Sequence, residues 1–426
     1  MKSKPKIAVI GAGSYVFSLS LLHDLIVDHR MQGAHLCLMD LDAEMAADMA
    51  AIARQIAGEA GVEVAVESTG SRELALEGAD FVTTSVAAQL IRRYEIDKQI
   101  IRKHGIREIL SECGGLGGLS YTLRSVPLIL GIARDMERLC PDAWLLNMSN
   151  PLPRVLDAVM NHTSIKALGF CNNAWGDENG YGPIARELGR EVDDIAVVTA
   201  GLNHFTWLLS VRDARTGEDL MPELNLSFRV GPLQTKLWHN YGALPLGGDT
   251  HVGEFVPFEP HLSEEHTAHH GTSEERDQRR AEIREAAEGK RSWHYLMENY
   301  GRSWERPADV IHALATGSSC HLDMVNLRND GAIANLPDEA IVEVPADVLG
   351  GAVEAVKVGE LPAAVAELCS KVSAAHHVAA EAAVTGSREL VAEAIRIDPA
   401  ITEKDAALEA IGEMIVAHTD LLPQFA

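Results

Sequence analysis

Two strand-like segments of this chain end on side chains that could bind a metal ion, each beside carboxamides that could bind hydroxyl groups. Residues 166–176 (KALGFCNNAWG) contain Cys171 followed by two asparagines, and residues 196–207 (AVVTAGLNHFTW) contain Asn203 and His204. A thiolate and an imidazole are good ligands for a divalent transition metal, and two protein ligands leave positions open for water or substrate. Carboxamides bind hydroxyl groups without adding charge. Taken alone, Cys171 and His204 could equally be a buried thiol and an ordinary core histidine.

A second chemical signal lies at the amino terminus, in the sequence KIAVIGAGSYVF. An apolar run over residues 6–10 leads into Gly11-Ala12-Gly13 and then into helical apolar spacing, which directs backbone N–H groups toward a pyrophosphate. The next strand ends in Asp40, whose carboxylate suits an adenosine ribose and would repel a 2′-phosphate. We predict an NAD site formed by Gly11, Gly13, Ser14, Tyr15 and Asp40. The alternative is a nucleotide-free turn, because Val16 occupies the usual third glycine position.

The elements that must position these groups alternate between strand and helix. Strand-like runs follow from Ala79 (ADFVTTSV) and in AWLLNMSNP, which Pro151 stops. Such alternation predicts an α/β fold with a doubly wound parallel Rossmann sheet. Between these two runs, the glycines of residues 112–127 (ECGGLGGLSYTLRSVP) indicate a loop that passes close to a ligand or lies free on the surface.

Composition narrows the possible partners. The chain has 426 residues, 46% hydrophobic content and a formal net charge of −25, which disfavours nucleic acid and anionic lipid and favours a small-molecule substrate. We find no apolar stretch near the roughly 20 residues of a membrane helix and no signal-peptide core, and we expect a cytoplasmic protein. Six cysteines without CxxC pairs argue against a disulfide framework and are mostly expected to be buried apolar residues.

At this point the chain resembles the family 4 glycoside hydrolases, which are NAD-dependent glycosidases. The motifs that carry the resemblance occur in a shared order: GAGSYVF at Gly11, GGLGGLSYTLRSVP at Gly114, CPDAWLLNMSNP at Cys140, GFCNNAWG at Gly169, GLNHFTWL at Gly201, HVGEFVPF at His251 and VNLRNDGAIANLPDEAIVEVP at Val325. The resemblance implies a fold similar overall to lactate and malate dehydrogenases. Residues 1–200 would form the NAD-binding Rossmann domain. Residues 201–426 would form an α+β domain for substrate binding, the metal site and assembly into a homo-oligomer, in this family commonly a dimer or tetramer.

The resemblance also implies a metal and a mechanism. Cys171 and His204 would bind a divalent metal, usually manganese. The sugar C3 would give a hydride to NAD, the C2 proton would then be removed, and the C1 substituent would leave by elimination before water adds and the hydride returns. NAD would therefore act as a catalyst, and the usual pair of catalytic carboxylates would not be needed.

Further site residues follow from the same resemblance. Asn150 would contact a sugar hydroxyl group. Asn172 stands where some members carry an acidic residue that acts as the general acid, so it could bind substrate but not supply a proton. The family's base is often a tyrosine near the position of His251, and a histidine suits that task. We keep Tyr241 and Glu254 as reserves for His251, with Glu254 also as a substrate contact.

The segment AAQLIRRYEIDKQ, which contains Arg92 and Arg93, indicates the class of substrate. In the phosphosugar members of the family a different pattern stands at this place. The two arginines could hold an anion, or they could pair with Glu95 and Asp97 at a helix start. We expect an unphosphorylated hexoside with an acidic C6 group, such as a uronide or a sulfoquinovoside, because related NAD-dependent sulfoquinovosidases resemble this family. Glucuronides, galacturonides and plain galactosides also remain open.

Two alternatives to the glycosidase function stay open. A dehydrogenase of the lactate/malate type would share the nucleotide domain, carry a His–Asp proton relay and accumulate NADH. A non-catalytic NAD sensor would bind NAD without turnover.

Within the charged residues 261–290, a group of histidines suggests a metal cluster, but irregular spacing favours a solvated loop or a subunit contact; these are His261, His266, His269 and His270.

Overall fold

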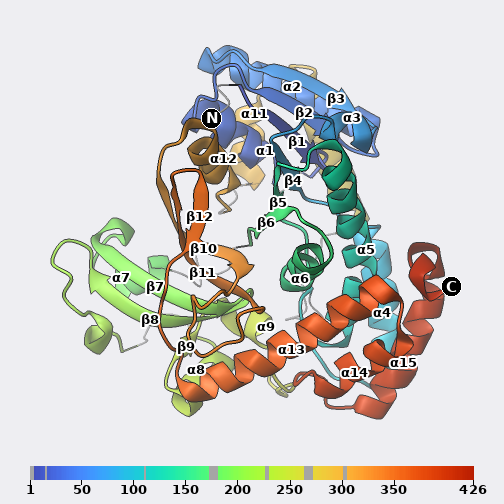
Figure 1. Ribbon diagram of the computed structural model, residues 1–426, viewed down its shortest axis with the longest axis vertical. Coiled ribbons are helices and arrows are strands. Elements are labelled where there is room, and N and C mark those ends of the chain that lie inside the picture. The colour runs from blue at the N-terminus through green and yellow to red at the C-terminus, as the bar shows by residue number, and fades with distance from the viewer. Residues whose placement is uncertain are drawn as a thin grey trace.

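One twelve-stranded sheet runs through both halves of the chain, in the order β3-β2-β1-β4-β5-β6-β10-β11-β7-β8-β9, with β12 paired to β11 (Figure 1). The structure is a computed structural model that describes residues 4–14, 17–109, 112–171, 181–225, 230–262, 272–300 and 305–426. The amino-terminal strands lie at the top of Figure 1, and the β7–β9 region lies at the lower left.

The strands from β3 to β6 pair in parallel, which confirms the predicted Rossmann sheet. They are β1 (Lys6–Ile10), β2 (His35–Met39), β3 (Ala65–Thr69), β4 (Phe81–Thr84), β5 (Trp144–Asn147) and β6 (Lys166–Gly169). Their order, 3-2-1-4-5-6, is that of dinucleotide-binding folds, with the ligand crevice where the order reverses between β1 and β4. The intervening helices are α1 (Ser18–His23), α2 (Ala43–Ala60), α3 (Arg72–Leu76), α4 (Leu90–Lys103), α5 (Gly115–Leu139) and α6 (Leu152–His162), with a π-helix at Asp24–Asp28.

Helix α5 corrects two expectations. The glycine-rich segment predicted as a loop starts this 25-residue helix, and Pro127 lies inside it. The helix forms because nearly all of its first three turns is buried against neighbouring elements, so tertiary packing outweighs the poor helix propensity of glycine and proline. It is also long and apolar enough to cross a membrane by length and composition, contrary to our expectation, but 83% of its apolar window is buried inside the protein. It is therefore a core helix.

The second half adds antiparallel strands to the same sheet. These are β7 (Ile195–Leu202), β8 (Phe205–Asp213), β9 (Leu244–Pro245), β10 (Cys320–Arg328), β11 (Ile341–Leu349) and β12 (Ala352–Ala355). The join is a single pair, Asn326 of β10 against Gly169 of β6. Because β7 crosses the predicted boundary between residues 200 and 201 and the sheet is continuous, the division into two domains stays a prediction.

The helices of the second half pack against elements of both halves of the chain. They are α7 (Tyr181–Glu187), α8 (Pro232–Tyr241), α9 (Gly248–Val252), α10 (Ser273–Ala287), α11 (Trp293–Tyr300), α12 (Pro307–Thr316), α13 (Ala363–Thr385), α14 (Arg388–Ile397) and α15 (Lys404–Ala417). Helix α13 packs against α5 and α6, and α15 packs against α4 and α5. These carboxy-terminal helices, orange to red in Figure 1, thus bury the elements that follow β4.

The segments that carry Cys171 and His204 come together although the strands before them are not neighbours in the sheet. Strands β10 and β11 lie between β6, which precedes Cys171, and β7, which precedes His204. A single cross-strand pair joins β6 to β10, Gly169 with Asn326, and a single pair joins β11 to β7, Glu343 with Gly201. The insertion of β10 and β11 therefore sets the spacing of the site.

Candidate active site

Cys171 and His204 lie together, with Sγ of the thiol 3.2 Å from Nε2 of the imidazole. Cys171 follows β6 after one intervening residue, Phe170, and His204 occupies the tight turn between β7 and β8 with φ of 62°. Non-glycine residues in this left-handed region are uncommon and concentrate at functional sites. Gly201 is required nearby, because a Cβ there would lie 2.5 Å from the Phe205 carbonyl oxygen.

The spacing of these two atoms fits a shared metal ion. Bonds of about 2.1 Å to nitrogen and 2.3 Å to sulfur, set at right angles, would hold the two atoms about 3.1 Å apart. Burial raises the pKa of the Cys171 thiol above its ordinary value, and the nearby His204 opposes this shift. A bound cation would favour the thiolate form. Cys171 and His204 are thus suited to hold a divalent metal.

Glu254 and Cys113 flank the other side of the imidazole. Oε1 of Glu254 lies 3.2 Å from His204 Nδ1, and the ligand atoms of Cys113, His204 and Glu254 all lie within 4.8 Å of one another. All three residues are buried. We expected most of the cysteines to be apolar filling, and Cys113 differs because its thiol borders the candidate metal ligands.

The carboxylate of Glu343 and the side-chain amides of Asn203 and Asn326 hold the turn that carries His204 in place. Asn203 donates from Nδ2 to the Cys171 carbonyl oxygen at 2.9 Å and to Glu343 Oε2 at 3.0 Å. Asn326 donates to the same Glu343 oxygen at 3.1 Å. Burial raises the pKa of Glu343 to about 7, although the two amide hydrogen bonds act in the opposite direction. The turn that carries His204 is therefore fixed to β6, β10 and β11.

Asn150 faces a carboxylate that we did not predict. Its Nδ2 donates to Glu112 Oε2, and its buried Oδ1 has no hydrogen-bond partner among the described residues. Glu112 lies just before α5, immediately upstream of the glycine-rich motif. A buried amide oxygen on Asn150 beside a carboxylate suits a polyol, because hydroxyl groups both donate and accept. The only sequence signal for Glu112 was its position next to that motif.

His251 lies beside His204, whereas Tyr241 packs elsewhere in the same region of the chain. The His204 and His251 rings meet edge to face with centroids 4.8 Å apart, and His251 Nδ1 lies 2.8 Å from the Gly247 carbonyl oxygen. Because Nδ1–H donates to that carbonyl, Nε2 keeps its lone pair. Burial, followed by the neighbouring His204, lowers the pKa of His251 to about 4. Tyr241 ends α8 with its ring against Trp207, centroids 6.0 Å apart.

The predicted nucleotide turn is a tight glycine turn whose backbone N–H groups, from Gly11 to Ser14, are bound to acceptors within the protein. Gly11 has φ of 85°, and a Cβ there would lie 2.2 Å from the Ser85 carbonyl oxygen. Gly13 donates from its backbone to Asp40 Oδ2 at 2.9 Å, and Asp42 N donates to the other Asp40 oxygen at 2.9 Å. The half-buried Asp40 carboxylate is thus held in place with lone pairs left for ribose hydroxyl groups. Ser14 follows in the same turn, with its N–H bound to the Gly11 carbonyl oxygen.

The two arginines have different surroundings. The buried Arg93 guanidinium donates to Gln89, to the Ala417 carbonyl oxygen and to Asp420. Arg92 is exposed, and its charge helps to lower the pKa of Asp420 after the larger effect of Arg93. Of the two alternatives, the pairing with Glu95 and Asp97 is therefore not found for Arg93, which pairs with Asp420.

Asp97 instead binds residues that we did not connect with it. Its Oδ2 accepts from Arg124 at 2.8 Å, and its Oδ1 lies 2.7 Å from His418 Nε2. Two of the predicted site residues, Tyr15 and Asn172, lie outside the described residues, as do His266, His269 and His270. His261 lies 3.5 Å from Asp249 Oδ2.

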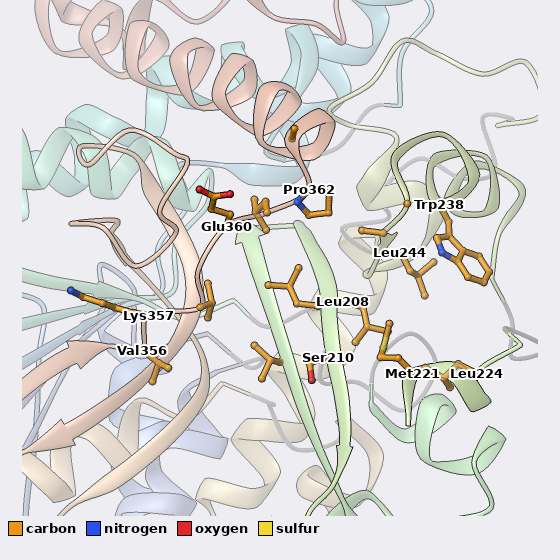
Figure 2. A pocket seen from close by; sticks show the side chains of 17 residues that line it. Leu208, Ser210, Met221, Leu224, Trp238, Leu244, Val356, Lys357, Glu360 and Pro362 are labelled. Atoms are coloured by element: carbon orange, nitrogen blue, oxygen red, sulfur yellow. The ribbon is translucent and has the colours of Figure 1, made fainter. Parts of the chain in front are cut away.

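A separate hollow of about 820 Å³ lies on the outer part of the β7–β8 hairpin (Figure 2). Its lining is mainly apolar and includes Leu208, Met221, Trp238, Leu244 and Pro362. Among the described residues that line it, none belongs to the predicted site. The chemistry is thus placed at the end of the hairpin and not in this hollow.

A family model described as family 4 glycosyl hydrolase matches residues 6–182, and one for its C-terminal domain matches residues 199–401. The alpha-galactosidase of Bacillus subtilis (strain 168) is 28% identical, covering 99% of each chain. The alpha-galacturonidase of the same organism is 30% identical, covering 93% of each chain.

Solved structures show the same fold. A 6-phospho-alpha-glucosidase from gut microorganisms, in complex with NAD and Mn²⁺, has a TM-score of 0.80 at 23% identity, covering 99% of this chain and 100% of that one. A malate dehydrogenase from Plasmodium falciparum, 13% identical, has a TM-score of 0.54 over 91% of this chain and 99% of that one, which confirms the predicted dehydrogenase-like fold. The two family models together match most of the chain, and the chain therefore belongs to the family 4 glycosyl hydrolases.

Proposed function

We propose that this chain hydrolyses the glycosidic bond of a hexoside by an oxidoreductive elimination and addition, with NAD and a divalent metal, Mn²⁺, as cofactors. The observation that carries the proposal is the 3.2 Å approach of Cys171 Sγ to His204 Nε2, on the same sheet as a glycine turn and Asp40 suited to NAD. The structural relative in complex with NAD and Mn²⁺ supports the choice of cofactors.

When bound, the two cofactors would supply the chemistry that the side chains lack, reversible hydride transfer by NAD and Lewis-acid polarisation of sugar oxygens by the metal. The chain supplies the binding and the proton transfer. Cys171 and His204 would hold the metal, and Gly11, Gly13 and Asp40 would hold the nucleotide. Tyr15 and Ser14 belong to the same proposed turn.

His251 is our choice for the base that removes the C2 proton. Its Nδ1 is bound to the Gly247 carbonyl oxygen, so Nε2 is the atom that can accept a proton. Its lowered pKa keeps the ring neutral at physiological pH, as a base must be. Tyr241 remains the reserve, although its ring packs against Trp207.

Polar groups around Asn150 would bind the sugar. Asn150 donates a hydrogen bond to Glu112, and its buried Oδ1 has no hydrogen-bond partner among the residues that the structure describes. The two side chains could therefore bind neighbouring hydroxyl groups, which both donate and accept. We propose Asn172, which follows Cys171 in the sequence, as a further contact. Since neither asparagine can give up a proton, a different group or water would protonate the leaving oxygen.

For the substrate we propose a hexoside without a 6-phosphate and with an acidic C6 group, a uronide or a sulfoquinovoside. A relative named alpha-galacturonidase supports the uronide. Arg92 is the better candidate for the acidic group, because it is exposed while Arg93 is buried against Asp420. The relative named alpha-galactosidase keeps a neutral galactoside as the comparison substrate.

Cofactor add-back would test this proposal. Protein stripped of nucleotide and metal would be given aryl glycosides that are neutral, uronic, 6-phosphorylated or 6-sulfonated, with NAD and Mn²⁺ restored separately and together. We expect hydrolysis only with both cofactors and without net NADH. NADH formed with each turnover would instead indicate a dehydrogenase, and tight NAD binding with no turnover would indicate a sensor.

A further inference from the structure

The buried Glu254 carboxylate contacts His204 on the side opposite Cys171. We propose that Glu254 is a positioning residue that fixes the tautomer of His204 and ties it to the start of helix α5, and that it is not a sugar contact. The proposal rests on the metal site of the proposed function, because it concerns how the chain presents His204 Nε2.

Both oxygens of Glu254 are already used by the protein. Oε1 lies 3.2 Å from His204 Nδ1, while Oε2 accepts from Cys113 N at 2.7 Å and from Gly114 N at 3.1 Å. The residue is 1% exposed. A carboxylate buried to this extent has little access to a substrate. It already serves as the hydrogen-bond partner of three nitrogen atoms of the protein.

The close approach of the two segments is built into the backbone. A Cβ at Gly114 would lie 2.0 Å from the Glu254 carbonyl oxygen, so only glycine allows this contact. On the other side, the Glu254 N–H donates to the His251 carbonyl oxygen at 3.1 Å. One short turn therefore joins His251 to Glu254, and Glu254 lies against the residues that begin α5.

These contacts determine which imidazole nitrogen carries the hydrogen. An ionised carboxylate only accepts, so Nδ1 must be the donor and Nε2 keeps the lone pair that faces Cys171. A carboxylate bound to the second nitrogen of a metal-binding histidine is a recurring arrangement that orients the ring and raises its basicity. Glu254 would perform this role here.

Glutamine at this position would create a conflict. If its oxygen accepts from Cys113 N and Gly114 N, its NH₂ group faces Nδ1 and forces the hydrogen onto Nε2. If the amide is reversed, its NH₂ group faces two buried backbone N–H groups, which lose their acceptor. Either orientation should weaken metal binding while leaving the side-chain volume nearly unchanged.

Glu108 provides a matched control. It is the second carboxylate at the same helix start, where its two oxygens accept from Leu116 N and Gly117 N, both at 2.8 Å. E108Q would thus disturb the beginning of α5 as E254Q does, but it would leave the Glu254–His204 contact in place.

The test is Mn²⁺ affinity in the absence of substrate and NAD, measured by the EPR signal of free Mn²⁺ for wild type, E254Q, E108Q and C171A. We expect the dissociation constant to rise roughly 10- to 100-fold in E254Q, as for other residues that orient metal ligands, and less than roughly threefold in E108Q. Equal affinities in E254Q and wild type, or equal losses in E254Q and E108Q, would overturn the proposal.

A second readout separates this inference from the proposed function. Metal-free protein labelled with ¹⁵N-histidine, with the His204 signals assigned through H204Q, reports the tautomer directly. At a pH high enough for a neutral imidazole, we expect the hydrogen on Nδ1 in wild type and a loss of that form in E254Q. If wild type shows no Mn²⁺ binding that C171A removes, the metal part of the proposed function fails, while the tautomer result still decides the role of Glu254.

Discussion

The candidate nucleotide turn and the candidate metal site are built in opposite ways. The turn consists of backbone over a few consecutive residues, from Gly11 to Ser14, with one distant carboxylate at Asp40. The metal site depends on side chains from separate segments, at Cys113, Cys171, His204 and Glu254. A local backbone feature can lose one contact and persist, whereas an assembled cluster depends on every segment that delivers a ligand.

Removing a proposed metal ligand should produce the largest effect. C171A or H204A should lower kcat/KM by about 10³-fold or more, since Lewis-acid stabilisation contributes several kcal/mol, while NAD affinity changes little. Activity assays and NAD titration of the same preparations would measure both. C320A, which alters another partly buried thiol, should behave like wild type. Full activity of C171A in the presence of a chelator would exclude the metal assignment.

Replacing His251 should have the next largest effect. H251A is expected to reduce kcat by roughly 10²- to 10⁴-fold, the usual contribution of a general base. The base acts when neutral, and its pKa is lowered to about 4, so His251 should not cause a loss of activity between pH 8 and pH 5. An acidic limb near pH 6.5 in wild type that disappears in H251N would contradict the lowered pKa.

A smaller effect is expected at the nucleotide turn. D40A should weaken NAD binding roughly 10- to 100-fold, because hydrogen bonds to a charged group contribute about 1.5–3 kcal/mol. Mn²⁺ affinity should not change, which would separate the two regions. D42A is the control, since Asp42 caps α2 through Met45 N and pairs with Arg280. Unchanged NAD affinity in D40A would remove the ribose role.

The smallest effect concerns the two arginines. R92A should reduce kcat/KM several-fold more for a uronide than for the matching neutral galactoside. R93A should affect both substrates equally and lower the melting temperature, because the Arg93 guanidinium is buried and bound to the carboxy-terminal segment. Equal losses on the two substrates in R92A would remove its proposed role in recognising an acidic group.

The same contrast explains what the sequence could predict. The strand and the glycine turn are adjacent in sequence and Asp40 directly follows the next strand, so the Rossmann sheet could be predicted from local patterns. Cys171 and His204 were candidates by residue type, but only the resemblance joined them in one metal site, since nothing local shows that β10 and β11 would place them together. Glu112, Cys113 and the orienting contact of Glu254 depend on segments far apart in the chain, and no local pattern reveals them.

Errors in the prediction have similar physical causes. The glycines and Pro127 of α5 have poor helix propensity, and burial of the helix outweighs it. The partner of Arg93 is Asp420, near the end of the chain, and local pairing rules consider only residues one helical turn away. β3 was not predicted because its residues are largely exposed at the sheet edge.

The central claim is that the chain cleaves the glycosidic bond by removing the C2 proton of the sugar. Hydrolysis of the preferred glycoside in D₂O, with NAD and Mn²⁺ present, would test it by NMR of the released sugar. The account predicts solvent deuterium at C2 of the product. Efficient hydrolysis that leaves the original C2 hydrogen in place would contradict it.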